Sequence, residues 1–329
     1  MKFGTITRCA ALLAASAFIS PMANKAAAQT QAWPQRNVQF VLPFGAGSAT
    51  DIAARLLAER LQVKWGKPVV IENRPGGDGL IAIRSFLTSN DDHVLLYASS
   101  ASFIAHPYTL PQKTPYDLNK DFSPIARVAD TLLSIAAPAA MNVSSLQEWV
   151  AAARANPGKF NVAGAPGVPE LAMTAFLRVN NLDAARVPYK DIVQAGSDLV
   201  ESRLQLMVTS YAIALPHLQS GRAKMLAVGS SERSQIAPDT PTAAEAGFPI
   251  LTTETTSGLY GPAGMSLELR TRIAADVMEA TRDPVVQQRL LATGQGPNPQ
   301  GPEGLAAALK RQEAAAATVA KELGIKPNI

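Results

Sequence analysis

The sequence of 329 residues has little of what thiol, metal and acid–base sites are usually built from. It contains one cysteine, Cys9, and three histidines, His93, His106 and His217, which are far apart along the chain. Their spacing matches no metal-ligand pattern, so each histidine reads as a surface or core residue. The composition predicts no disulfide in the mature protein, no thiol chemistry and no metal site.

Strong charge and a hydrolase motif are also missing. Charged residues make up 17% of the chain, and no run of basic residues indicates a nucleic-acid partner. The segment Gly45-Ala46-Gly47-Ser48-Ala49 is a near match to a Gly-x-Ser-x-Gly elbow, but it lacks the required frame. We therefore predict no catalytic residue and no cofactor, although a catalytic set dispersed along the chain stays open as an alternative.

The N-terminus has the form of a secretory signal peptide. Lys2 and Arg8 precede an apolar run from Cys9 to Ile19, and small residues follow up to Ala28. The apolar run is about half of the roughly 20 residues that a membrane-spanning helix requires. We predict a signal peptide over residues 1–28, cleavage after Ala28 and export to the periplasm.

The rest of the chain predicts an α/β protein with two lobes. About 300 residues exceed the usual size of one core, and short apolar runs alternate with helical patterns, which indicates mainly parallel sheets flanked by helices. We place lobe 1 at residues 29–127 plus 254–329 and lobe 2 at 128–253. The expected strands are Val38–Leu42, Val69–Glu72, Val94–Tyr97, Leu132–Ala136, Leu204–Val208 and Met225–Val228; the expected helices include 51–61, 145–154 and 303–323.

The strongest candidate site is the loop between the first strand and the first helix. Glycines let a backbone approach a ligand closely, and free N–H groups at a helix start attract anions. An ordinary strand-to-helix turn explains the pattern about equally well. The candidate ligand-binding residues of this loop are Phe44, Gly45, Ala46, Gly47, Ser48, Thr50 and Asp51.

The same loop permits a rival interpretation as a dinucleotide site. Gly45, Gly47 and Thr50 follow a strand, and Glu72 at the end of the next strand could bind a ribose. The third glycine of that fingerprint is missing, and an exported protein meets little nicotinamide cofactor. An exported dinucleotide-binding or hydrolytic enzyme therefore remains the alternative function.

Loops after other expected strands supply further candidates, because a cleft between two lobes would be lined by such loops. One is the Gly- and Pro-rich segment that begins after residue 163, and another is the serine cluster after Tyr97. Ser210 and Tyr211 follow the strand that ends at Val208. The candidate residues are Ala165, Pro166, Gly167, Val168, Ser99, Ser100, Ser102, Ser210 and Tyr211.

Many segments in register resemble the Bug receptors, the periplasmic solute-binding proteins of tripartite tricarboxylate transporters. The resemblance covers nearly the whole mature chain. It is carried by Trp33-Pro34-x-Arg36, by 43–51, by 66–76, by Asp121-Phe122-x-Pro124, by 155–159, by Val187-Pro188-Tyr189-Lys190, by 214–217, by 238–247, by 258–264 and by 324–327.

The resemblance implies a Venus-flytrap fold that closes on a small carboxylate without changing it. The carboxylate would be held by facing loops, Phe44 to Asp51 and Ala163 to Glu170, through backbone N–H groups and bridging waters. It also implies a monomer that delivers its ligand to transporter membrane subunits, or alternatively to a sensor kinase.

Two departures from the family pattern bear on the ligand. Ser48 stands where the family usually has the second glycine of a pair, and the facing loop carries Ala165, Pro166, Val168 and Pro169 in place of the usual hydroxyls. Glu170 follows, where its charge would oppose a second anionic group unless it points away. These residues favour a carboxylate with an aliphatic or aromatic middle over citrate or malate, unless Val168 and Glu170 face away from the ligand.

Overall fold

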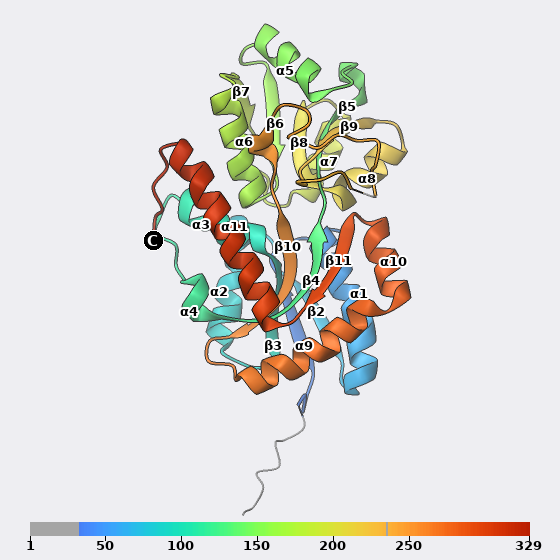
Figure 1. Cartoon of the computed structure of the whole chain (residues 1–329), viewed down its shortest axis with the longest axis vertical. Helices are drawn as coiled ribbons and strands as arrows, with labels where there is room; N and C mark the ends of the chain where they lie inside the picture. Colours follow the sequence, from blue (N-terminus) through green and yellow to red (C-terminus); the bar gives the residue numbers. More distant parts are fainter. Residues whose placement is uncertain (1–32, 235) are drawn as a thin grey trace, which may run out of the picture.

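The computed structural model describes residues 33–234 and 236–329, except the side chains of Ser102 and Glu322 (Figure 1). Two β-sheets lie one beyond the other along the long axis of the molecule, and helices cover both faces of each sheet. The two-lobed α/β class predicted from the sequence is confirmed. The predicted signal peptide and its cleavage site fall outside the described residues.

The first lobe is built on a six-stranded sheet with the order β11-β4-β10-β3-β1-β2. Its strands are β1 (Val38–Leu42), β2 (Val69–Asn73), β3 (Val94–Ser99), β4 (Phe122–Thr131), β10 (Thr255–Pro262) and β11 (Gln295–Gln300). One face packs against α1 (Ala49–Trp65), α9 (Leu267–Arg282) and α10 (Pro284–Ala292), and the other against α2 (Leu80–Ser89), α3 (Ser100–Thr109) and α11 (Pro302–Glu322).

Local sequence explains where the first helix begins and ends. The hydroxyl of Ser48 accepts a hydrogen bond from the N–H of Asp51, which caps the N-terminus of α1. Gly66 ends the helix in the left-handed conformation, with φ of 61°, that glycine adopts without strain. The apolar residues of α1 at helical spacing, among them Leu57 and Leu61, are fully buried against the sheet.

The second lobe is built on a five-stranded sheet with the order β7-β6-β8-β5-β9. Its strands are β5 (Leu133–Pro138), β6 (Phe160–Gly164), β7 (Ala184–Arg186), β8 (Leu206–Ser210) and β9 (Ala223–Val228). Helices α5 (Leu146–Ala155) and α6 (Val168–Val179) cover one face around Trp149 and Phe176, and α7 (Val193–Val200) and α8 (Tyr211–Gln219) cover the other.

Both sheets are mixed, which corrects the expectation of mainly parallel sheets. The pairs β1–β2, β1–β3, β6–β7 and β6–β8 are parallel, whereas β10 is antiparallel to β3 and β4, β11 to β4, and β5 to β8 and β9. Four strands of these antiparallel pairs, β4, β5, β9 and β10, lead into or out of the passages between the lobes, whereas β11 follows α10 within the first lobe. A strand that returns from the other lobe needs no crossover helix, so it is free to run antiparallel.

Two segments of chain pass between the lobes side by side. Leu132 separates β4 from β5, and residues 229–254 lead from β9 back to β10. The carbonyl of Leu133 accepts a hydrogen bond from Gly229 N at 2.9 Å. The carbonyl of Gly229 in turn accepts one from Thr253 N at 2.8 Å. The bond from Gly229 N to Leu133 O ties the returning segment to the start of β5, next to the outgoing passage at Leu132.

The lobes also meet beside this connection. Leu171 and Ala175 of α6 pack with Leu323 at the end of α11, and Arg178 of α6 donates a hydrogen bond to the carbonyl of Leu323. Figure 1 shows α6 and α11 on the same side of the molecule. Among the described residues, no helix is both long and apolar enough to cross a membrane.

Candidate functional site

A small pocket lies where the two lobes face each other. Its volume is about 40 Å³, so the lobes enclose little free space here. Residues of both lobes contribute, among them Thr131, Leu133 and Thr255, which flank the passages. The lining residues are Phe44, Ser48, Ala49, Thr50, Ser99, Ala101, Thr131, Leu133, Ala165, Pro166, Pro169, Ile192, Thr209, Ser210, Ile213 and Thr255. We call this set the cleft.

Helix N-termini converge on the cleft. It is lined by residues at the starts of α1 and α3 from the first lobe and of α6, α7 and α8 from the second. Within the described residues, the N–H groups of Ala49 and Thr50 on one side, and of Ala212 and Ile213 on the other, donate to no backbone carbonyl. Unpaired N–H groups at helix starts carry partial positive charge, so the cleft favours an anion.

None of the described residues that line the cleft has an ionisable side chain. Their polar side-chain atoms belong to hydroxyls, and their apolar ones come mainly from Phe44, Leu133, Ile192 and Ile213. The hydroxyls of Thr209 and Ser210 are buried without a hydrogen-bond partner among the described residues. Because a buried unpaired hydroxyl costs about 1–3 kcal/mol, the closed cleft would gain from a ligand that pairs with them.

The carboxylate of Asp51 stabilises the conformation of the first loop. It accepts hydrogen bonds from Gly47 N at 3.0 Å, from the side-chain amide of Asn73 at 3.0 Å and from Arg55. Burial opposes ionisation of this carboxyl, but the bonds from Arg55, Gly47 and Asn73 outweigh burial and hold the pKa of Asp51 below its usual range. Asp51 and the N–H of Gly47 therefore hold the loop in shape and are not free for a ligand.

The structure brings seven of the sixteen predicted ligand-binding residues into the cleft lining. They are Phe44, Ser48, Thr50, Ser99, Ala165, Pro166 and Ser210. Those that it places outside the lining are Gly45, Ala46, Gly47, Asp51, Ser100, Gly167, Val168 and Tyr211. Ser102 belongs to α3, but its side chain lies outside the described part of the structure.

Three of the predicted residues that lie outside the cleft lining make contacts that stabilise the fold. The Ser100 hydroxyl donates to Gln312 of α11 at 2.5 Å and accepts from Thr256 N at 3.0 Å, so it ties α3 to its own lobe. Val168 packs against the aromatic cluster of the first lobe. The N–H of Tyr211 donates to the carbonyl of Leu132, the residue between β4 and β5.

Nine lining residues were not among the predicted contacts. They are Ala49, Ala101, Thr131, Leu133, Pro169, Ile192, Thr209, Ile213 and Thr255. Thr131 and Thr255 lie on the strands that enter and leave the passages, and no local motif distinguishes such positions. Thr209 could have been found, because it immediately precedes the predicted Ser210 at the end of a buried strand.

Glu170 lies outside the cleft lining, although it follows the second loop directly. Its carboxylate pairs with Arg186 of β7 at 2.8 Å, and it is folded back against Gly164. Burial raises the pKa of Glu170, while the Arg186 charge partly offsets that effect. The expectation that its charge opposes a second anionic group of the ligand loses its structural basis, since the charge is directed at Arg186.

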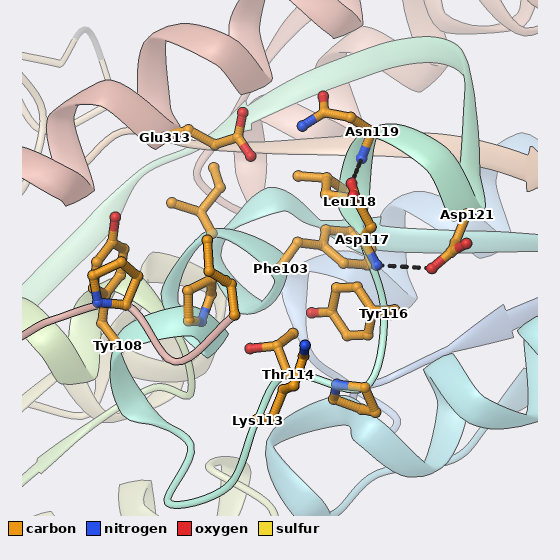
Figure 2. Close-up of a pocket in the computed structure, with 15 residues that line it drawn as sticks. Phe103, Tyr108, Lys113, Thr114, Tyr116, Asp117, Leu118, Asn119, Asp121 and Glu313 are labelled. Carbon is orange, nitrogen blue, oxygen red and sulfur yellow. Dashed lines mark hydrogen bonds between the residues drawn. The ribbon is translucent and has the colours of Figure 1, made fainter.

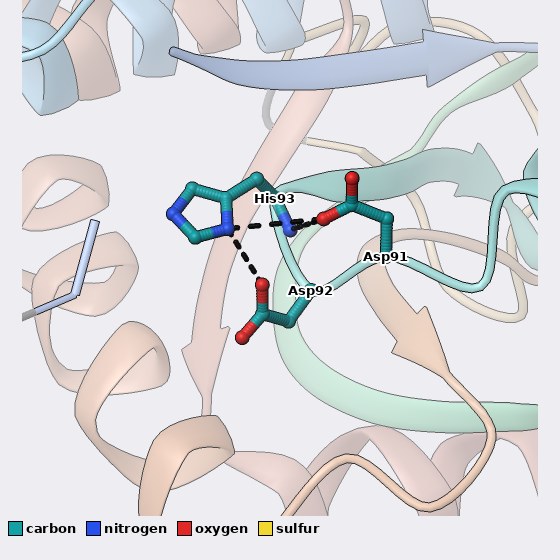
Figure 3. A group of neighbouring side chains, drawn as sticks. All are labelled: Asp91, Asp92 and His93. Atoms are coloured by element: carbon teal, nitrogen blue, oxygen red, sulfur yellow. Dashed lines mark hydrogen bonds and ion pairs between the residues drawn. The ribbon is translucent and has the colours of Figure 1, made fainter. Parts of the chain in front are cut away.

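One group of side chains has the spacing of metal ligands. Asp91, Asp92 and His93 bring candidate ligand atoms within 4.8 Å of one another (Figure 3). The ring of His93 is already engaged on both sides: Nδ1 lies 2.6 Å from Asp92, and Nε2 accepts from Gln35 N at 3.1 Å. Asp91 pairs with Arg36 at 2.6 Å. With both ring nitrogens and one carboxylate engaged, this group fastens the start of the described chain to the first sheet.

The acid expected of a dinucleotide site is also engaged. Glu72 pairs with Arg74 at 2.6 Å and accepts a hydrogen bond from the side-chain amide of Gln39. These contacts belong to the edge of the first sheet, and Glu72 does not line the cleft.

The chain is similar to known proteins over most of its length. A family model described as "Tripartite tricarboxylate transporter family receptor" matches residues 53–324. The chain is 31% identical to a UPF0065 protein of Bordetella bronchiseptica over 87% of this chain and 85% of that protein. It is 29% identical to protein BugT of Bordetella pertussis over 85% of this chain and 87% of that protein.

Solved structures have the same fold over nearly their full length. MatC from Rhodopseudomonas palustris with bound malate has a TM-score of 0.81 at 28% identity and covers 87% of this chain and 99% of its own. An R. palustris protein with adipate has a TM-score of 0.84 at 26% identity, covering 90% and 100%. The periplasmic binding protein BugD has a TM-score of 0.80 at 28% identity, covering 89% and 99%.

Proposed function

The chain belongs to the receptor family of tripartite tricarboxylate transporters, and from this we propose that it is a periplasmic receptor that captures a small organic carboxylate. The ligand is enclosed between a lobe of residues 33–131 plus 254–329 and a lobe of residues 133–253; the boundary expected after residue 127 moves to Leu132, because β4 of the first sheet continues to Thr131 and β5 of the second begins at Leu133. Leu132 and the segment around Thr253 form the hinge, since the hydrogen-bonded passages meet there. The receptor binds its ligand and leaves it chemically unchanged.

The observation that carries this proposal is the neutral, hydroxyl-rich cleft at the meeting point of helix N-termini. Unpaired N–H groups of Ala49, Thr50, Ala212 and Ile213 suit a carboxylate, and the unpaired hydroxyls of Thr209 and Ser210 add donors. Both lobes contribute, so a bound carboxylate stabilises the closed form over the open one.

The cleft gives little support to the alternative of an exported enzyme. A hydrolase requires a base within reach of its nucleophile, whereas the described lining of the cleft has hydroxyls and no ionisable side chain. A dinucleotide site would require a free acid at the end of β2, and the carboxylate of Glu72 is held by Arg74 and Gln39.

The ligand that we propose has carboxylate ends and an aliphatic or aromatic middle. Phe44, Leu133, Ile192 and Ile213 offer apolar contact to such a body. Two structural neighbours hold malate and adipate, which are a hydroxylated and an unsubstituted dicarboxylate. Of the two types, the apolar lining favours the adipate-like one. The partners are the membrane subunits of a tripartite tricarboxylate transporter.

Thermal unfolding of the mature protein with a panel of acids tests the proposal. At about 100 times the dissociation constant, a ligand adds roughly 2.7 kcal/mol to the free energy of unfolding. We expect stabilisation by adipate, its longer homologues or terephthalate that exceeds the effect of malate and citrate, and unchanged acid after hours of incubation.

Three results would count against it. Turnover of any acid, or stabilisation by NAD in the absence of any effect of the acids, would contradict the receptor function. Binding of citrate or malate at least tenfold more tightly than every apolar acid, a difference of about 1.4 kcal/mol, would contradict the proposed ligand type while leaving the receptor function intact.

A further inference from the structure

A second and larger cavity opens on the outer side of the first lobe. Its volume is about 860 Å³, within the range of small-molecule sites, and its described lining shares no residue with the cleft. The end of α3, the segment 113–121 with α4 (Leu118–Asp121), the middle of α11 and the C-terminal residues Pro327 and Ile329 form its walls (Figure 2). We call this the outer cavity.

The walls of the outer cavity are fixed by hydrogen bonds. Thr114 N donates to the carbonyl of Asn328 at 2.9 Å, and Asn328 N donates to the carbonyl of Pro107 at 2.6 Å. The ring of Tyr116 packs edge-on against Phe103 and Phe122, and its hydroxyl bonds His106. A cavity held in this way is formed before any ligand enters.

The charges around the outer cavity are mostly negative. Asp117, Asp121 and Glu313 line it, against one cation among the described lining residues, Lys113. Asp117 is used by the fold, since it caps α4 and pairs with Lys120 at 2.7 Å, and Asp121 accepts from Asp117 N at 2.7 Å. Glu313 makes no hydrogen bond or ion pair with any described residue.

Glu313 is therefore a half-buried carboxylate without a partner in the described part of the chain. Figure 2 shows it facing the space between Tyr108 and Asp117. Burial raises the pKa of Glu313, and the negative charge of Asp117 raises it further. A positive charge in that space would stabilise the ionised carboxylate of Glu313, and so would oppose the rise in its pKa that burial and Asp117 cause.

A second polar group of the outer cavity also lacks a partner. Thr114 is 6% exposed, and its hydroxyl is buried without a hydrogen bond among the described residues. Figure 2 shows this hydroxyl turned toward the side of the cavity where Tyr108 lies. The outer cavity thus has an unpaired carboxylate on one wall and an unpaired hydroxyl buried in another, and Tyr108 and Tyr116 are among its lining residues.

We propose that the outer cavity binds a small organic cation, an amine or guanidine carried on an apolar or aromatic body. The cationic head pairs with Glu313 and lies near Asp117, where a charge-assisted hydrogen bond to the carboxylate is available. The apolar body contacts Tyr108, Ile104 and the proline rings of the wall, and the ring of Tyr108 adds a cation–π attraction. This ligand is opposite in charge to the one assigned to the cleft.

Titration calorimetry with 2-phenylethylamine tests the proposal, with 2-phenylethanol as the neutral probe of the same body. We expect the amine to bind and the alcohol to bind at least about tenfold more weakly, equivalent to 1.4 kcal/mol or more. Glu313→Gln should weaken amine binding to a similar degree. Lys113→Ala should strengthen it, because it removes the cation of the described lining. The matched control is Glu303→Gln, which neutralises an exposed acid on the same helix outside the cavity.

Several results would overturn the proposal. They are the absence of amine binding, equal binding of amine and alcohol, or unchanged amine binding in a folded Glu313→Gln variant, with folding checked by circular dichroism. The titration is repeated with the cleft saturated by its best carboxylate. Displacement of the amine by the carboxylate would place the amine in the cleft and also overturn the proposal, whereas failure of every acid to bind would affect only the receptor function.

Discussion

Oδ2 of Asp191 lies so close to Gly45 that a methyl group added to the glycine would sit 2.0 Å from it. Gly45 belongs to the first loop of the first lobe, and Asp191 lies just before α7 of the second lobe, where its carboxylate accepts from Val193 N at 3.1 Å. The closed arrangement therefore brings a carboxylate of one lobe onto bare backbone of the other. Gly45 has no positive φ, so its lack of a side chain serves this contact and not the local turn.

Gly45→Ala should consequently weaken ligand binding by hindering closure. Overpacking costs about 1–3 kcal/mol, which corresponds to roughly 5- to 150-fold in affinity. Titration calorimetry measures the loss, and small-angle scattering should show a larger radius at saturating ligand than in the unmodified protein. Gly301→Ala is the control, because a methyl group there meets no atom within 4 Å. The double change with Asp191→Ala should restore binding; if it does not, the contact does not limit closure.

Thr209→Val should weaken carboxylate binding by about 0.5–1.5 kcal/mol, the net value of one hydrogen bond. Valine keeps the shape of the side chain and removes a hydroxyl that has no partner among the described residues, so the melting temperature without ligand should fall little or rise. Thr114→Val removes another unpartnered buried hydroxyl, which lies at the outer cavity and not at the cleft or the hinge, and it should leave carboxylate affinity unchanged. Equal affinities of the two variants would mean that Thr209 does not contact the ligand.

Asp51→Asn should lower stability at neutral pH and alter its dependence on acid. The folded pKa of Asp51 lies below the ordinary value of about 3.9. Its ionised form thus contributes stability that is complete above that ordinary value and is lost as the pH falls through the folded pKa. The difference in melting temperature between the unmodified protein and the variant should be constant from about pH 5 to 7 and narrow below about pH 4.

Glu59→Gln serves as the control for this series, because Glu59 lies on the same helix and makes only an exposed pair with Arg289 at 3.4 Å. Its melting temperature should follow that of the unmodified protein at every pH. A constant offset for Asp51→Asn down to about pH 3 would show that the carboxylate charge is not what holds the loop.

Glu170→Gln should leave the receptor's preference for a dicarboxylate over a monocarboxylate unchanged. The Glu170 carboxylate pairs with Arg186 and lies outside the cleft lining. The ratio of adipate to hexanoate affinity should therefore stay within about twofold of that of the unmodified protein, or 0.4 kcal/mol. A selective gain in dicarboxylate affinity would show that the charge reaches the ligand after all.

The sequence was most informative where structure is decided locally. The strand Val38–Leu42 was predicted with the bounds that the structure gives it, and the loop before the first helix contributes Phe44, Ser48 and Thr50 to the cleft. Glycine and capping residues act within a few positions of themselves, so their effect can be read from a short window of sequence.

Contacts between distant segments could not be predicted in the same way. Thr131 and Thr255 lie side by side because β4 pairs with β10. No motif or spacing in the sequence predicts this pairing. In the serine cluster, Ser99 caps α3 and lines the cleft. The Ser100 hydroxyl instead donates a hydrogen bond to Gln312 of α11, which is 212 positions further along the chain. Which of two adjacent serines meets the ligand depends on where α11 packs, and that is decided by the whole fold.

The absence of ionisable side chains from the described cleft lining has an evolutionary consequence. A binding site centred on an arginine is hard to alter, because removing its partner leaves a buried charge unpaired at a cost of about 3–5 kcal/mol. In this cleft, exchange of Thr209 or Ser210, whose hydroxyls bond no described residue, alters one neutral hydrogen bond to the ligand, about 1 kcal/mol. A lineage of such receptors can therefore drift from one nutrient acid to another by single substitutions, with each intermediate still folded and still able to close.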